Sequence, residues 1–178
     1  MISLSQLTAI LPHSRSRAPK YIDALNEAMG EFAITTKARQ AAFLAQIGHE
    51  SGQLLYVQEI WGPTAAQLRY EGRKDLGNTQ PGDGRRFAGH GFIQVTGRAN
   101  HFACALYFDK TMDEIVQWLI SPEGACRSAG WFWHTHDLND LADAGDFAAL
   151  TKKINGGYNG LSDRVTLYNR AINVLGER

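Results

Sequence analysis

Apolar residues recur at three- and four-residue intervals along most of the chain, a spacing that places them on one face of a helix. Phe43, Ile47 and Glu50 follow one another in this way, so one apolar stripe ends on a carboxyl group. Such stripes predict helices, with their caps, over residues 4–11, 21–29, 37–50, 112–120, 121–133, 146–156 and 162–175. A chain of 178 residues with this pattern and no internal repeat or linker predicts one mainly α domain over residues 1–178.

The middle of the chain has a different character. Residues 52–91 are rich in glycine, with prolines and polar stretches such as GNTQPGDGRR, which are typical of turns. Only residues 65–70 predict a helical turn or two. The run GFIQVTGR, residues 91–98, predicts a short extended segment because Phe92, Ile93 and Val95 favour strands. Long irregular segments inside a compact domain usually carry function, so we expect residues 52–100 to form the wall of a cleft.

Charge and composition argue against several classes of partner. Lys plus Arg number 18, as do Asp plus Glu, so no overall field predicts binding to nucleic acid or stable association with a membrane. Residues 1–17 lack the basic segment and unbroken apolar run of a signal peptide, so we expect synthesis in the cytoplasm and release by another agent. Cys104 and Cys126 do not form a CxxC motif and predict buried free thiols. A monomer is expected.

Metal chemistry is not predicted. His49 begins a run that resembles HExxH, but its fifth position is Gln53, and His134 and His136 lack a third ligand nearby in the sequence.

The tryptophans mostly predict core positions, since Trp118 and Trp133 stand at helical spacing among apolar residues. Trp61, in a loop, is the candidate for stacking on a ligand ring.

Glu50 is the first candidate for chemistry. It continues the apolar stripe of its helix and emerges where the helix gives way at Gly52. A carboxyl group there is partly desolvated, which favours the neutral, proton-donating form that a general acid needs. A glutamate in the last helical turn also opposes the helix dipole at a cost of about 0.3 to 1 kcal/mol, so stability alone does not favour it. We therefore interpret Glu50 as a general acid.

An acid that acts on a glycosidic bond works with a second carboxylate, which activates water or attacks the sugar carbon. Glu59 follows beyond the end of the helix, where a chain that turns back across a cleft could place it opposite Glu50. Glu71, Asp75 and Asp83 lie in the same glycine-rich region and compete for this role. Spacing alone does not choose among them.

Three segments, in the right order, resemble glycoside hydrolase family 19. They read AAFLAQIGHESGQLLYVQE, RKDLGNTQPGDGRRFAGHGFIQVTGRANH and INGGYNGLSDRVTLYNRAINVLG, and the resemblance extends from residue 40 to residue 175. The family includes plant and bacterial chitinases and a branch of bacteriophage endolysins, and the RKDLGNTQPGDG stretch and the short chain are similar to the endolysin branch. The resemblance implies a lysozyme-like helical domain of two lobes with a loop-rich substrate cleft.

The resemblance also assigns catalytic roles. Glu50 corresponds to the family's general acid and Glu59 to its general base, which selects Glu59 among the competing carboxylates. The family's IQL[ST] segment reads IQVT here, and the hydroxyl of Thr96 would help the base to hold the attacking water. The implied reaction is hydrolysis of a β-1,4 glycosidic bond next to an N-acetylated sugar, with inversion and with no metal or organic cofactor.

Further polar residues match substrate-contacting positions of the family. Their amide and guanidinium groups suit the hydroxyl and N-acetyl groups of an amino sugar. With Trp61, whose candidacy comes from its loop position, the expected substrate-binding residues are Gln94, Asn100, Asn155, Arg164 and Trp61. The sequence departs from the family pattern at His101, where tyrosine is common, at Val95, and around Glu59, where it reads QEIWG.

These features predict an endolysin-type glycosidase that degrades bacterial peptidoglycan after release from the cell in which it is made. Three alternatives remain open at this stage. A chitinase would use the same residues on chitin, a lytic transglycosylase would keep Glu50 without needing Glu59, and a catalytically silent module would only bind the glycan.

Overall fold

The computed structural model describes residues 1–176. The elements are α1 (Leu4–Ile10), η1 (Pro12–Ser14), α2 (Ala18–Glu31), α3 (Lys37–Glu50), α4 (Ala65–Leu68), η2 (Lys74–Leu76), α5 (Asp83–Arg86), α6 (Arg98–Tyr107), α7 (Ile115–Leu119), α8 (Pro122–Thr135), α9 (Leu138–Asp143), α10 (Phe147–Asn155) and α11 (Leu161–Gly176). The mainly α class predicted from apolar spacing is confirmed. No helix within the described residues is long and apolar enough to cross a membrane.

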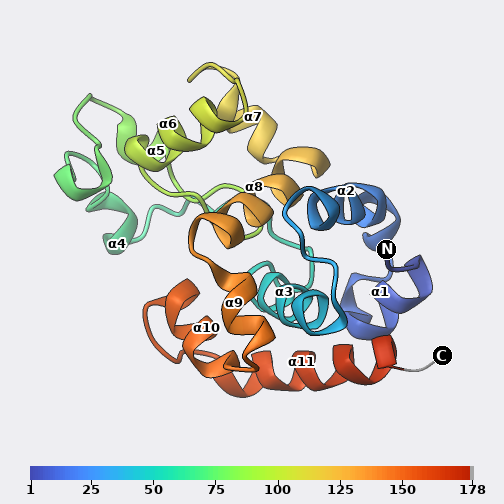
Figure 1. The fold of residues 1–178 in the computed structure, drawn as a ribbon. Helices are drawn as coiled ribbons and strands as arrows, with labels where there is room; N and C mark the ends of the chain where they lie inside the picture. The colour runs from blue at the N-terminus through green and yellow to red at the C-terminus, as the bar shows by residue number, and fades with distance from the viewer. Residues whose placement is uncertain (177–178) are drawn as a thin grey trace.

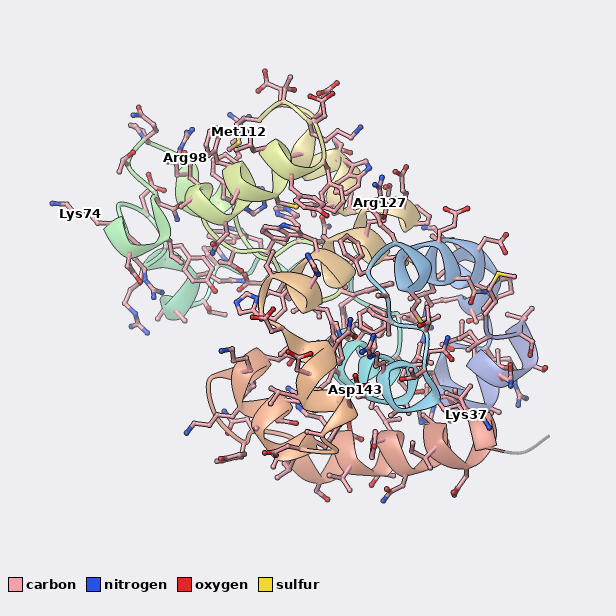
Figure 2. The ribbon with its side chains drawn as sticks, viewed as in Figure 1. Lys37, Lys74, Arg98, Met112, Arg127 and Asp143 are labelled. Atoms are coloured by element: carbon pink, nitrogen blue, oxygen red, sulfur yellow. The ribbon has the colours of Figure 1, made fainter. Side chains whose placement is uncertain are left out.

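The helices gather into two lobes (Figure 1). The short elements α4, α5, α6 and α7 lie on one side, α3, α9, α10 and α11 lie on the other, and α2 and α8 lie between them. Figure 2 shows the same division: Lys74, Arg98 and Met112 lie toward one end of the molecule, and Lys37 and Asp143 lie toward the other. The irregular segment between α3 and α6 therefore belongs mostly to the lobe opposite α11.

Helix α3 forms the centre of the second lobe. It begins at the cap of Thr36, whose side chain accepts a hydrogen bond from the backbone N–H of Arg39, and residues 40–48 are all buried. Phe43 packs edge-on against the ring of the fully buried Trp133, with 5.3 Å between the ring centroids. Gly48 lies so close to Leu11 that an added Cβ would stand 2.5 Å from its methyl carbon. This packing fixes the carboxyl end of α3.

The prediction of an extended segment over residues 91–98 is wrong, because the described residues form isolated bridges only, between Gln58 and His90 and between His90 and Val95. Gly91 and Gln94 both have positive φ, 82° and 49°, and they turn the chain back within four residues. The Val95 backbone thus returns to exchange hydrogen bonds with His90, at 2.7 and 3.1 Å.

Three helices were absent from the sequence-based prediction: α5, α6 and α9. Helix α6 buries His101, Cys104 and Ala105, while Phe102 and Leu106 are more than half exposed. Its large apolar residues therefore lie on the exposed face, and their spacing does not indicate the buried one. Helix α9 has only 6 residues, and no helix was predicted for this segment. The expectation of buried free thiols at the two cysteines is confirmed.

Candidate active site

Glu50 is the last residue of α3. The helix stops there because the hydroxyl of Ser51 donates to the carbonyl of Ile47 at 2.6 Å and accepts the backbone N–H of Leu54 at 2.8 Å, while Gly52 adopts a positive φ of 57°. The Glu50 side chain is 22% exposed. The buried helix therefore delivers one carboxyl group to the surface at a fixed point.

A buried guanidinium lies behind Glu50. Arg164 of α11 is 1% exposed and donates from Nη2 to Glu50 Oε1 at 2.5 Å and from Nη1 to Gln46 Oε1 at 2.5 Å. Gln46 is fixed in turn by donating to the hydroxyl of Thr151 at 2.8 Å. Arg164, expected to contact substrate, is thus behind the carboxylate, and it would influence a ligand mainly through Glu50.

Glu59 is held by donors from three directions. Gln67 Nε2 donates to Glu59 Oε1 at 2.9 Å, the hydroxyl of Tyr70 reaches the same oxygen at 3.4 Å, and the backbone N–H of Gly89 donates to Oε2 at 3.1 Å. The Glu59 backbone N–H donates to the Gly89 carbonyl at 2.7 Å, which ties the two segments together. Burial, and then the charge of Glu59, raise the pKa of the Tyr70 hydroxyl, so Tyr70 stays protonated and remains a donor.

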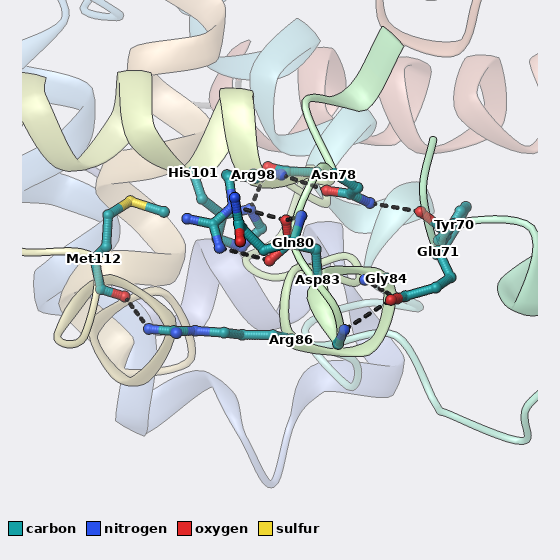
Figure 3. Close-up of polar contacts among 12 residues, drawn as sticks. Tyr70, Glu71, Asn78, Gln80, Asp83, Gly84, Arg86, Arg98, His101 and Met112 are labelled. Carbon is teal, nitrogen blue, oxygen red and sulfur yellow. Dashed lines mark hydrogen bonds and ion pairs between the residues drawn. The ribbon is translucent and has the colours of Figure 1, made fainter. Parts of the chain in front are cut away.

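The competing carboxylates serve the structure of their own lobe (Figure 3). Glu71 accepts the backbone N–H groups of Gly82 and Gly84 at 2.7 and 2.9 Å, at the start of α5. Asp83, 2% exposed, pairs with the guanidinium of Arg98 at 2.6 and 2.7 Å, and Arg98 holds the pKa of that carboxyl below its usual range.

The third competitor, Asp75, pairs with Arg73 at 2.8 Å on the surface, and this guanidinium lowers the pKa of the carboxyl. All three competitors are therefore engaged by structural partners. Glu59 differs from Asp75 and Asp83 because a tyrosine, an amide and a backbone N–H hold it without any cation, and it differs from Glu71 because two of its donors are side chains.

A pocket of about 300 Å³ joins the two glutamate segments. It is lined by Glu50, Tyr56, Gln58, Ile60 and Gln94, so Glu50 faces the residues on either side of Glu59. Three larger hollows, of about 490, 360 and 310 Å³, lie elsewhere and are lined by neither glutamate. The chemistry of the residues, rather than the size of the hollow, singles out the pocket at Glu50.

Gln94, Thr96 and Asn100 form a linked group beside this pocket. The Thr96 hydroxyl donates to the Gln94 carbonyl at 3.0 Å, which uses its hydrogen and leaves its oxygen lone pairs as acceptors. The amide of Asn100 donates to the Thr96 carbonyl at 2.7 Å, and its residue is exposed. The Gln94 side chain lies over Gly89, where an added Cβ would stand 2.2 Å from Gln94 Oε1.

Two other predicted ligand contacts have distinct environments. Asn155, the last residue of α10, has a buried side-chain oxygen with no hydrogen-bond partner among the described residues. A buried acceptor without a partner is costly, and a donor from a bound ligand would satisfy it. Trp61 is half-buried and lies between the exposed Ile60 and the Gly62–Pro63 turn, on the same segment as Glu59.

The histidine pair at the end of α8 is occupied by packing. The His136 ring stacks on Phe132 with 4.0 Å between centroids, and His134 lies 6.1 Å from the ring of Phe32. Within residues 1–176, no group of three or more His, Cys, Asp and Glu side chains is placed to hold a metal ion.

Comparison with known proteins identifies the family of the chain. A scan against protein-family models finds no match. A glycosyl hydrolase family 19 domain-containing protein of Haemophilus influenzae is 30% identical over 94% of this chain and 94% of its own length. The chain belongs to glycosyl hydrolase family 19. An endochitinase of Arabidopsis thaliana is 33% identical over 75% of this chain, which spans only 45% of that protein.

Solved structures show the same fold for this family 19 member. A bacterial family 19 chitinase superposes with a TM-score of 0.77 and 24% identity, over 99% of this chain and 96% of that one. Chitinase C from Streptomyces griseus superposes with a TM-score of 0.75 and 21% identity, over 98% and 76% of the two chains. The lysozyme-like helical fold implied by the sequence resemblance is confirmed.

Four residues that hold the two glutamates were not predicted from the sequence: Gln67, Tyr70 and Gly89, which contact Glu59, and Gln46, which acts on Glu50 through Arg164. Gln46 stands four residues before Glu50 and so on the same face of α3, a signal that was available. Gln67 stands three residues after Thr64, which signals a helix cap but not a contact with Glu59. Tyr70 and Gly89 lie in loops whose path the sequence does not reveal.

Proposed function

We propose that this family 19 enzyme hydrolyses β-1,4 glycosidic bonds of bacterial peptidoglycan with inversion, using Glu50 as general acid and Glu59 as general base. The observation that carries the proposal is the pocket between the two glutamate segments, together with the contrast in how each carboxyl group is held. Glu50 has one oxygen on Arg164, whereas both oxygens of Glu59 accept hydrogen bonds.

The acid step follows from the contacts of Glu50. Arg164 occupies Oε1, so the transferable proton belongs on Oε2, which is the oxygen left for the leaving group of the sugar. Once the proton has moved, the remaining carboxylate lies against a buried guanidinium, and this charge-assisted hydrogen bond stabilises it. Arg164 thus favours the state that the acid reaches after the bond is cleaved.

The base step follows from the donors around Glu59. The three donors stabilise the ionised carboxylate, which is the form that removes a proton from water. A water placed between Glu59 and Thr96 would donate one hydrogen to each, because the Thr96 hydroxyl already gives its own hydrogen to Gln94. Its oxygen lone pairs then remain directed at the sugar carbon.

Substrate binding in this proposal uses polar residues from both lobes, of which Gln94 lines the pocket at Glu50. The unpartnered oxygen of Asn155 would accept a hydroxyl or N-acetyl N–H of the sugar, and Gln94 and Asn100 would bind from the opposite lobe. Trp61, half-buried beside Glu59, would stack on a sugar ring. The proposal requires no cofactor, and we expect the enzyme to act as a monomer on the cell wall after its release from the cytoplasm.

The choice of peptidoglycan rests on the similarity of RKDLGNTQPGDG to the endolysin branch. Chitin is the second candidate substrate, and the specific observation that favours it is that the Arabidopsis relative is an endochitinase and the structural neighbours are chitinases. The two substrates share the N-acetylated sugar that the pocket would bind, and they differ in the peptide stem.

The deciding experiment compares purified peptidoglycan with chitin oligomers as substrates, and analyses the products by mass spectrometry. We expect reducing-end fragments from peptidoglycan, and a loss of at least about 100-fold in activity for Glu50→Gln and Glu59→Gln with the fold retained. Faster turnover of chitin oligomers would assign the enzyme to that substrate instead. Anhydro-muramyl products with normal activity in Glu59→Gln would indicate a transglycosylase and overturn the two-carboxylate mechanism.

The mechanism also makes a geometric demand. An inverting enzyme needs room for water between its base and the sugar, so the two carboxyl groups should be separated by roughly 6.5 to 9.5 Å. A crystal structure with a bound oligosaccharide measures this separation directly. A separation near 5 Å would instead indicate a retaining mechanism.

A further inference from the structure

Gln67 makes an unusually complete set of hydrogen bonds next to Glu59. The side chain is in α4 and is 4% exposed. Its amide nitrogen donates to Glu59 Oε1 at 2.9 Å and to the Ile60 carbonyl at 2.8 Å, while its oxygen accepts the backbone N–H groups of Gly62 at 3.1 Å and Thr64 at 2.8 Å. All four bonding positions of a primary amide are therefore used.

This set of partners fixes the orientation of the amide. The N–H groups of Gly62 and Thr64 can only donate, so they require the oxygen of Gln67 on their side. The nitrogen must then face Glu59 and the Ile60 carbonyl. A carbonyl can only accept a hydrogen bond, and the same holds for the Glu59 carboxylate while it is ionised. The loop from Gly62 to Thr64 thus holds a donor in place against one oxygen of the proposed base.

We propose that Gln67 is a positioning residue that orients the Glu59 carboxylate and keeps it ionised during the reaction. The inference rests on the proposed role of Glu59 as general base. According to this inference, Gln67 in α4, which does not line the pocket, sets the reactivity of Glu59. Tyr70 gives the same oxygen a longer contact of 3.4 Å, so Gln67 is the principal side-chain donor.

A purely structural role is the competing explanation, since Gln67 also caps α4. Thr64 and Gln67 form a reciprocal capping box, in which the Thr64 hydroxyl accepts the backbone N–H of Gln67 at 3.2 Å. The cap and the contact with Glu59 use different atoms of the Gln67 side chain. Substitutions can therefore separate the two roles.

The test variant is Gln67→Glu, which has the same shape and retains oxygen acceptors for Gly62 and Thr64. It replaces the donor facing Glu59 by a second carboxyl group, and two adjacent carboxyl groups share a proton near neutral pH. We expect the acidic limb of the kcat/KM profile on peptidoglycan to move to higher pH, with activity recovering as pH rises. Below that limb, kcat should fall by about ten-fold or more with KM little changed.

The matched control is Thr64→Ala, which weakens the same cap without touching the contact with Glu59. It should lower the unfolding temperature and leave the acidic limb of the profile in its wild-type position. A second variant, Gln67→Met, removes the donor without adding a charge and carries the test if Gln67→Glu does not fold. It should lower kcat about ten-fold or more, with KM little changed.

The outcomes distinguish the positioning role of Gln67 from the proposed role of Glu59 as general base. Near wild-type activity in Glu59→Gln would refute the base assignment and this inference together. An inactive Glu59→Gln, combined with a wild-type acidic limb and kcat in Gln67→Glu, would refute the positioning role alone. A shifted limb in Thr64→Ala equal to that in Gln67→Glu would also refute it, because the cap rather than the donor would then control the base.

Discussion

The buried histidine pair behind Gly89 should make the fold sensitive to mild acid. His101 Nδ1 lies 2.8 Å from the Gly97 carbonyl, which can only accept, so that nitrogen carries the hydrogen. His101 Nε2, 3.0 Å from His90 Nδ1, must then be the acceptor of a hydrogen on His90. Protonation of His101 adds a hydrogen to Nε2, so the contact survives only if His90 moves its own hydrogen from Nδ1 to Nε2.

The magnitude follows from the pKa of His101. Burial, followed by the nearby His90 and Arg86, lowers this pKa from 6.5 to about 4, and the bond to Gly97 only partly opposes the change. A histidine whose pKa is lowered by folding contributes stability above its unfolded value and loses it as pH falls through the interval. The lowered pKa of His101 corresponds to a contribution of about 3 kcal/mol to the free energy of unfolding, of which about 2 kcal/mol should be lost between pH 7 and pH 4.5.

This interval is separate from the titration of the carboxylates. Asp83, whose pKa is lowered by Arg98, loses its contribution only below its unfolded value of 3.8. The pKa of His90 is also lowered, mainly by burial, so it adds to the loss in the same interval as His101. Urea unfolding followed by circular dichroism at pH 7, 6, 5 and 4.5 measures the effect.

The control is His101→Phe, which keeps a ring against Phe87 and removes the titrating group. This variant should be less stable at pH 7, since it leaves the His90 donor without its acceptor. Its stability should nevertheless change less than that of the wild type between pH 7 and pH 4.5, by about 2 kcal/mol. Equal losses in both proteins over this interval would refute the assignment to His101.

Three further predictions concern residues around the glutamates. Arg164→Met should reduce the free energy of unfolding by about 3 to 5 kcal/mol, measured in urea, because it leaves Gln46 and Glu50 without their shared partner. Thr96→Val keeps the side-chain volume but removes the hydroxyl. It should reduce kcat/KM on peptidoglycan by a factor that corresponds to about 1 to 3 kcal/mol of lost transition-state stabilisation, without lowering the unfolding temperature. Gly89→Ala should reduce kcat strongly, as steady-state kinetics would detect, because the new methyl group would displace Gln94 and disturb the N–H that holds Glu59.

The sequence predicted the helices that carry apolar stripes toward the core. Helix α3 was predicted with the bounds that the structure has, because Phe43 and Ile47 face inward and the chain breaks at Gly52. Helix α6 was missed because its buried face is built from His101, Cys104 and Ala105, while larger apolar side chains face solvent. Hydrophobic spacing fails where a lobe is held together by polar contacts instead.

The segment from Glu59 to Gly97 shows why the rest could not be predicted. Its path is set by hydrogen bonds between residues far apart in sequence, such as those that join Glu59 to Gly89 and Asn78 to Arg98. The sequence identifies the donors and acceptors there but not their pairs. Spacing therefore left Glu71 and Asp83 in competition with Glu59, the family resemblance selected Glu59, and only the structure shows the partners of the other two.

The environment of Glu50 illustrates the opposite case, in which a local pattern contained more information than was used. Gln46 and Glu50 are four residues apart, so both side chains project from one face of α3. Two acceptors at this spacing, at the end of a buried helix, require a donor that can bridge them, and the fork of a guanidinium has the necessary reach. The resemblance had assigned Arg164 to the substrate, but the spacing on α3 favours a position behind the acid, where the structure has it. We expect an arginine so placed to act on the charge of Glu50 rather than on the sugar. Arg164→Met should accordingly reduce kcat even with substrate saturating.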